Sequence, residues 1–109
     1  STHTDTELWK WEMFKRILSK TSDRECLLYT YSASTAVRGA LLASGWYVGL
    51  GRPTGTRSHT TVAANRAGYK SQWCREVNWL KREFLDQWSR SGSRNPEWDD
   101  EIRRHPQFQ

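Results

Sequence analysis

The sequence predicts a small α/β domain followed by a helical tail. Three observations predict this fold class: residues 4–20 have the period of an amphipathic helix, Cys26–Tyr31 is apolar at both alternating sets of positions, and a glycine-rich turn separates two further extended segments. The chain has 109 residues, the length of one ordinary domain. The order helix, strand, helix, strand, strand over residues 4–65 therefore predicts a sheet that helices cover and that ends in a hairpin.

The first predicted helix spans residues 4–20. Thr4 and Glu7 have the spacing of a capping box, in which a hydroxyl and a carboxylate satisfy the first backbone amides. The apolar positions recur at intervals of three and four residues, which is the period of one helix face. They are Leu8, Trp11, Met13, Phe14, Ile17 and Leu18. Lysines and arginines occupy the remaining faces, so we expect one buried and one solvated side.

The first predicted strand is Cys26–Tyr31. Apolar residues at both alternating sets are typical of a strand that is covered on both faces, as in a parallel sheet. This pattern favours burial of Tyr29 and Tyr31 over the alternative, in which exposed rings stack on nucleic-acid bases. The polar stretch 32–35 then suits a helix cap. A narrow apolar stripe follows at Ala36, Val37, Ala40 and Leu41, and Gly45 stands where a helix often ends in a left-handed residue.

Two more strands are predicted, at Trp46–Leu50 and Thr60–Asn65, with loop residues over 51–57 between them. From Tyr69 onward a second helical pattern begins. Its apolar residues lie four, three, four and four apart, which is one helical face, and they are Trp73, Val77, Leu80, Phe84 and Trp88. Residues 91–96 end this helix, and a polar tail carries Trp98 and Phe108 as isolated anchors. We therefore divide the chain into residues 1–68 and a helical, tryptophan-rich extension, residues 69–109.

Composition excludes a membrane-spanning protein. Hydrophobic residues make up 36% of the chain and charged residues 27%, and no apolar run approaches the roughly 20 residues of a membrane span. Without a visible targeting segment we expect a cytoplasmic protein, and its two cysteines predict no disulfide framework. Seven tryptophans are many for so short a chain. Some of these rings are expected to meet a surface outside the segment, and the start at Ser1 is consistent with a piece of a longer protein.

The residues offer no catalytic or metal-binding constellation that spacing alone can define. The three histidines are scattered, at His3, His59 and His105. The acidic run 99–101 lacks the alternating ligands and glycine turn of a metal loop, and a solvated charge run is the favoured interpretation. Residues 49–55 are rich in glycine, but the segment lacks the lysine and hydroxyl residue that end a phosphate-binding loop. A hairpin turn therefore explains these glycines better.

The basic residues are more informative than the catalytic or metal-binding candidates, and they indicate a nucleic-acid partner. The net charge is +5, and the isoelectric point is about 9.6. Arg38, Arg52 and Arg57 lie in or beside the second helix and the predicted hairpin. Arginine suits phosphate because its planar fork donates two parallel hydrogen bonds. We interpret these three arginines as RNA phosphate contacts, and ordinary surface charge remains the alternative.

A family resemblance lies in the middle of the chain. Three features carry it: the segment Thr30–Leu41 (TYSASTAVRGAL), the pair Gly45-Trp46, and Gly55-Thr56-Arg57. In this order and spacing they resemble the closing part of the MnmC-like methyltransferases, which use S-adenosylmethionine to methylate a transfer-RNA wobble uridine. The first helix is also similar, with Trp9 near its start, although Thr4-Asp5 replaces the family's Asn-Pro. The resemblance covers residues 4–66 well and the tail weakly.

The resemblance implies the C-terminal portion of a Rossmann-like class I methyltransferase sheet, strands 5 to 7, with the last strand antiparallel. It implies transfer RNA carrying 5-aminomethyl-2-thiouridine as substrate and S-adenosylmethionine as cofactor. The family's glycine-rich donor turn, ribose-binding acid and Asp-x-Phe-x-Pro segment are absent from this sequence. The donor site is therefore expected mostly outside this chain, and either a missing N-terminal half or a second copy is expected at the open sheet edge. The alternative function is a non-enzymatic basic module that binds RNA or protein.

Overall fold

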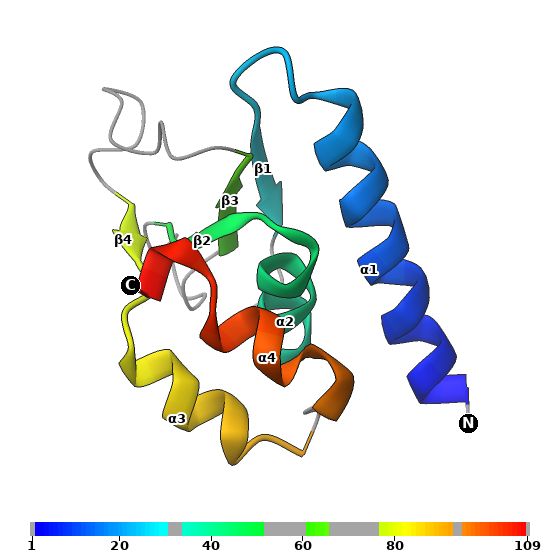
Figure 1. Ribbon diagram of the computed structural model, residues 1–109, viewed down its shortest axis with the longest axis vertical. Coiled ribbons are helices and arrows are strands. Elements are labelled where there is room, and N and C mark those ends of the chain that lie inside the picture. The colour runs from blue at the N-terminus through cyan, green and yellow to red at the C-terminus, as the bar shows by residue number, and fades with distance from the viewer. Residues whose placement is uncertain (1, 31–33, 52–60, 66–76, 93–94, 109) are drawn as a thin grey trace, which may run out of the picture.

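The computed structural model describes the backbone of residues 2–8 and all atoms of residues 9–30, 34–51, 61–65, 77–92 and 95–108 (Figure 1). The helices are α1 (Thr2–Lys20), α2 (Thr35–Ser44), α3 (Glu83–Ser89) and α4 (Asp99–Arg103). The strands are β1 (Leu27–Thr30), β2 (Tyr47–Leu50), β3 (Thr61–Ala64) and β4 (Asn78–Trp79), and short 3-10 turns η3 (Pro96–Trp98) and η4 (Pro106–Phe108) flank α4. The order of elements up to β3 confirms the predicted order.

The four strands form one sheet in the order β1-β3-β2-β4. Strand β3 runs antiparallel to β1 and to β2, so β1 and β2 are parallel to each other. Val62 of β3 lies opposite Tyr29 on one side and opposite Gly49 on the other. The predicted hairpin between β2 and β3 is confirmed, and α2 is the crossover that connects the two parallel strands.

Helix α1 packs beside α2 and supplies one wall of the core. Phe14 is buried, and its backbone carbonyl accepts a hydrogen bond from Trp46 Nε1 at 2.9 Å. The helix begins at Thr2, before the predicted start. The capping-box prediction was therefore wrong, because Thr4 lies inside the helix, where the preceding backbone is already helical.

Strand β1 differs from the sequence prediction. Tyr29 is 64% exposed, so the prediction that it is buried in a two-sided sheet was wrong. The reason is that β1 is the outermost strand and its direct neighbour β3 is antiparallel, whereas the pattern was interpreted as a central strand between parallel neighbours. Tyr31 lies outside the described residues.

Helix α2 is the centre of the molecule, with α1 on one side and α3 and α4 on the other (Figure 1). Ser34 caps its start, because the Ser34 side chain accepts a hydrogen bond from the backbone N–H of Ala36 at 3.1 Å. Gly45 ends it with φ +112°, as predicted. The buried surface is wider than the predicted stripe, because every residue of 39–44 is buried.

The predicted helix over residues 69–90 is wrong at its centre. Asn78 and Trp79 form β4, which pairs with Leu50 and Gly49 of β2. The exposed edge of β2 accounts for the difference, since its backbone groups need partners and Leu80 N donates to Val48 O at 3.0 Å. Among the described residues of this segment, a helix forms at its end, as α3, with Phe84 and Trp88 buried. Residues 69–76, which include Trp73, lie outside the described part.

The C-terminal residues pack on the same core as α1 and α2. The predicted anchors Trp98 and Phe108 are buried, and the sequence analysis missed Ile102 and His105, which are buried with them. Asp99 is also not simply solvated, because it accepts a hydrogen bond from Trp88 Nε1 at 2.8 Å. None of the helices in the described ranges is both long and apolar enough to cross a membrane.

Candidate functional site

The candidate site lies at the carboxyl edge of the sheet. Since β1 and β2 are parallel, their last residues, Thr30 and Leu50, lie at the same edge. Thr61, the first residue of β3, lies between them, opposite both. In open α/β sheets, ligands bind outside the carboxyl ends of the parallel strands. This edge is therefore where the fold itself predicts a binding site.

Arg38 is the charged residue that the fold holds at this edge. It projects from α2, and its Nε donates a hydrogen bond to Thr61 Oγ1 at 2.9 Å. The side chain is half-buried, and burial lowers the pKa of the guanidinium from its usual very high value. No carboxylate among the described residues pairs with it. A cation that is held in place and has no carboxylate partner within the described ranges suits an oxyanion such as a phosphate.

The other two arginines of the predicted RNA contact, Arg52 and Arg57, lie outside the described residues, as does His59. The segment that contains them leaves the sheet at Gly51, after β2, and returns at Thr61. Both of its ends therefore attach at the edge where Arg38 lies. Of the three arginines, the structure describes only Arg38, which lies at the carboxyl edge. Contact of all three with RNA stays a prediction.

A shallow groove of about 200 Å³ adjoins the carboxyl end of β2. Its walls include Leu50 of β2, Trp79 of β4, Lys81 of the segment between β4 and α3, and Gln87 of α3. The sequence analysis missed this groove, because the predicted helix over residues 69–90 placed Trp79 and Lys81 on a helix surface. Only the pairing of β4 with β2 brings an indole and a lysine next to Leu50. An aromatic side wall beside a cation can accommodate a planar group that carries negative charge.

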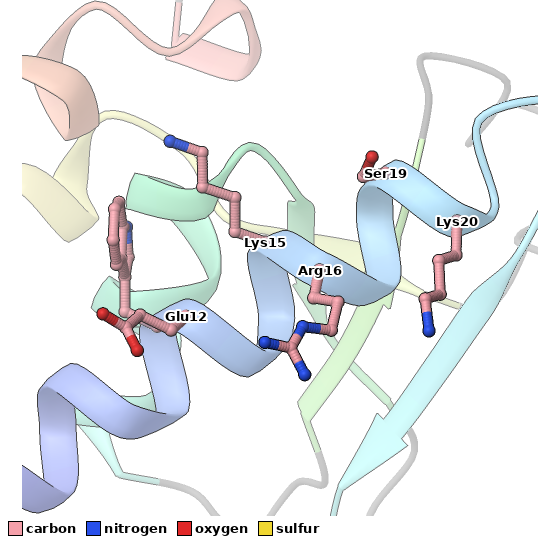
Figure 2. Close-up of a pocket in the computed structure, with 6 residues that line it drawn as sticks. Glu12, Lys15, Arg16, Ser19 and Lys20 are labelled. Atoms are coloured by element: carbon pink, nitrogen blue, oxygen red, sulfur yellow. The ribbon is translucent and has the colours of Figure 1, made fainter.

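The basic face of α1 is a second charged surface. An open groove of about 520 Å³ runs along this helix, lined by Trp11, Glu12, Lys15, Arg16, Ser19 and Lys20. Figure 2 shows that Arg16 and Lys20 extend to one side of the helix and Lys15 and Ser19 to the other. Lys15 Nζ lies 4.8 Å from the centre of the Trp11 ring, a cation–π contact. This surface carries charge, but every residue that lines it comes from one helix.

His105 is buried, and its ring makes contacts that hold the C-terminal segment in place. Its Nδ1 accepts a hydrogen bond from Gln107 N at 3.0 Å, and its ring packs edge-on against Tyr47 at 4.9 Å. Burial lowers the pKa of His105, and the backbone carbonyl of Trp46 acts in the opposite direction. Within the described ranges, no three histidine, cysteine, aspartate or glutamate side chains gather as metal ligands would.

Comparison with known proteins identifies the class to which this fold and edge belong. The model of a family of S-adenosyl-L-methionine-dependent methyltransferases matches residues 1–66, from α1 through β3. The chain therefore belongs to this methyltransferase family. No curated protein and no solved structure matches it.

Family membership implies S-adenosylmethionine as the cofactor, and the described residues allow a test of whether this chain alone would hold it. The donor carries a positive sulfonium and a ribose that is usually bound by a carboxylate. The described carboxyl edge instead presents the cation of Arg38, without an ion-paired carboxylate. These residues do not fit a donor site by themselves, so we derive no step of methyl transfer from them.

Proposed function

We propose that this chain is the substrate-side portion of a methyltransferase that acts on the wobble uridine of transfer RNA, with 5-aminomethyl-2-thiouridine as the nucleoside that is methylated. The observation that carries the proposal is the position of Arg38, a half-buried cation held at the carboxyl edge by Thr61. Membership of the methyltransferase family supplies the reaction class. The net charge of +5 supports a polyanionic partner.

In this proposal β1, β2 and β3 are strands 5, 6 and 7 of a class I methyltransferase sheet. Two features support this assignment. A helix connects the parallel strands β1 and β2, and the hairpin after β2 leads into an antiparallel last strand. Both features correspond to the end of the sheet that the family resemblance implies.

Arg38, Arg52 and Arg57 then hold RNA phosphates, so that the nucleoside lies at the carboxyl edge. Arg38 has two roles. Its Nε joins α2 to β3, and the rest of its fork faces the substrate as a donor. The donor S-adenosylmethionine is bound mainly by a portion of the enzyme outside this chain, which supplies the methyl group.

Binding of an anticodon stem-loop tests the RNA contact. We expect Arg57→Ala to weaken binding and to reduce the slope of log K against log salt by about 0.7–0.9, because one phosphate contact is lost. Arg82→Ala is the matched control, since Arg82 is exposed and makes no described side-chain contact. Unchanged binding of Arg57→Ala at low salt would remove Arg57 from the interface.

The same assay tests the nucleoside. A stem-loop that carries 5-aminomethyl-2-thiouridine at the wobble position should bind more tightly than one that carries uridine. Equal affinities at every salt concentration would mean that the chain contacts phosphates only, and the wobble-uridine substrate would then be wrong.

The second candidate function is a non-enzymatic basic module that binds RNA or protein. The observation that favours it is the lack of donor-binding groups among the described residues of the carboxyl edge. The coding sequence upstream of Ser1 distinguishes the two functions. A glycine-rich turn and an Asp-x-Phe-x-Pro segment there would support the methyltransferase, whereas a start codon directly before Ser1 would favour the module.

A further inference from the structure

The groove beside β4 is formed almost entirely by the C-terminal extension. The family model matches residues 1–66, and of the residues that line this groove only Leu50 lies within that range. The others come from β4, from α3 and from the segment between them, and Figure 1 shows β4 leading directly into α3. Any binding by this groove is therefore a property that the extension adds to the matched part.

Two carboxamide side chains line the groove, at Asn78 of β4 and Gln87 of α3. Both are exposed, and neither side chain forms a hydrogen bond with the described residues. The other carboxamides within the described ranges all bond the backbone, and they are Asn65, Asn95 and Gln107. A carboxamide presents a donor and an acceptor side by side, which suits the edge of a nucleobase. The two amides that the fold does not use for its own structure thus occur in one groove.

The remaining lining residues make the groove apolar inside and balanced in charge at its rim. Leu50, Leu80 and Phe84 supply apolar surface, and all three are at least partly buried. Lys81 and Glu83 are exposed and carry opposite charges. A carboxylate repels a phosphate, but it can accept a hydrogen bond from the amine of a base. The groove therefore suits a neutral, planar group with polar edges better than it suits an anion.

The groove lies at the same edge of the sheet as Arg38. Thr61 is opposite Leu50, and Leu50 is opposite Asn78, so these three residues form one row across neighbouring strands. Residues directly opposite in antiparallel strands have their side chains on the same face of the sheet. Arg38 bonds Thr61, and two strand spacings, about 10 Å, separate Thr61 from Asn78. One RNA loop can therefore reach both places, with a phosphate at Arg38 and a base in the groove.

We propose that the groove beside β4 binds one unpaired base of the substrate RNA, a neighbour of the nucleoside that is methylated. The inference rests on the proposed function, which makes RNA the substrate and Arg38 a phosphate contact. The base packs against Leu50 and Leu80, and the carboxamides of Asn78 and Gln87 bond its edge, which only an unpaired base offers. The groove, about 200 Å³, is smaller than the roughly 300 Å³ at which pockets for whole small ligands begin, so it holds a single base.

Nitrogen-15 spectra of the full chain test this contact without any substitution. When an unmodified anticodon stem-loop is added, the side-chain amide signals of Asn78 and Gln87 should shift in step with binding. The signals of Asn65 and Asn95 should stay in place, because these side chains bond the backbone and do not line the groove. A fully paired RNA hairpin of the same length should leave all four signals unmoved, because its base edges are already paired.

Matched variants separate a base contact from a phosphate contact. Asn78→Ala and Gln87→Ala should each weaken stem-loop binding about fivefold or more, since the bonds to the base edge are lost. In both variants the slope of log K against log salt should stay unchanged, because no phosphate contact is removed, whereas Arg57→Ala reduces it. Ser89→Ala is the control, since Ser89 is exposed on α3 but does not line the groove, and it should bind as the unchanged chain does.

Three outcomes would overturn the inference. They are stem-loop binding that leaves the amide signals of Asn78 and Gln87 unmoved, equal shifts with the paired hairpin, and unchanged affinity in either alanine variant. If Arg57→Ala still reduces the salt slope in any of these cases, the proposed function stands without the groove. If the unchanged chain does not bind the stem-loop, the proposed function fails, and the inference fails with it.

Discussion

Asn65 joins three parts of the chain with one side chain. Its Nδ2 donates to Thr21 O and to Arg24 O, both at 2.7 Å, and its Oδ1 accepts from Cys26 N at 2.9 Å. These bonds fix the turn from α1 into β1 against the end of β3. In the sequence, Asn65 is only the last residue of a predicted strand, because its partners lie about forty positions away along the chain.

We expect Asn65→Ala to lower the free energy of unfolding by about 1–3 kcal/mol, because three backbone groups lose their partner. Urea denaturation followed by circular dichroism measures this loss. Asn78→Ala is the matched control, since the Asn78 side chain is exposed and should change the free energy by no more than about 0.5 kcal/mol. Similar losses in the two variants would show that the Asn65 bonds do not stabilise the turn.

His105 predicts a pH dependence of stability. Burial lowers the pKa of His105 below its ordinary value of 6.5, so the unfolded chain binds a proton more readily than the folded one. The stabilisation is therefore complete above the unfolded-state pKa of about 6.5 and decreases as the pH falls toward the lower folded-state pKa.

The free energy of unfolding should accordingly be smaller at pH 5.5 than at pH 7.5. In His105→Gln the difference between these two pH values should shrink, because the other titrating groups are unchanged. A variant that retained the full pH difference would assign it to groups other than His105.

At the scale of elements, the contact between α2 and α3 depends on a glycine, which has no side chain, at the point where the two helices meet. Gly39 lies in the middle of α2, and a methyl group there would collide with the six-membered ring of Trp88. Trp88 is almost fully buried and bonds Asp99, so it has little room to move. The glycine therefore serves the packing of α3 on α2 rather than the helix, in which glycine is unfavourable.

Gly39→Ala tests this packing. In an unobstructed helix the change would stabilise by up to about 1 kcal/mol. Here we expect it to destabilise by about 1–3 kcal/mol, because overpacking outweighs helix propensity. In a Trp88→Leu background the cost of Gly39→Ala should diminish, and Gly92→Ala, which meets open space, should be close to neutral. Thermal unfolding measures the unchanged chain and the four variants, and an undiminished cost in the Trp88→Leu background would argue against the collision.

At the scale of the whole molecule, the C-terminal residues contribute to the central core. Trp88, Trp98 and Phe108 belong to the same buried cluster as Phe14 and Trp46. Gln107 adds polar contacts, since its side chain accepts from Val48 N at 2.9 Å and donates to Val48 O and Leu80 O. The tail thus completes the edge of the sheet beside β4.

We therefore expect one cooperative unfolding transition for the entire chain. Tryptophan fluorescence and far-ultraviolet circular dichroism should give coincident urea midpoints, because small domains with one core unfold in a single step. Two separate transitions would instead support independent units at residues 1–68 and 69–109, the division that the change in composition predicts.

The candidate site was only partly predictable. Arginine chemistry indicated Arg38 in the sequence, but its bond to Thr61 depends on the order of strands. The open edge of β1 was expected from the family resemblance, and the exposure of Tyr29 was not, because local alternation cannot distinguish an edge strand from a central one. The groove beside Trp79 required the pairing of β4 with β2, which replaces a helix that periodicity favoured.

The sequence by itself determined the local elements from α1 to β3, a cap for α2 within residues 32–35, the end of α2 at Gly45, and the excess of positive charge. These depend on neighbouring residues, on helical or alternating period, and on composition. Only the tertiary structure decided the position of Arg38 beside Thr61, the conversion of residues 78–79 to a strand, and the burial of His105 and Ile102. Each of these depends on partners that are far away in the sequence, and their backbone or packing requirements outweigh local preference.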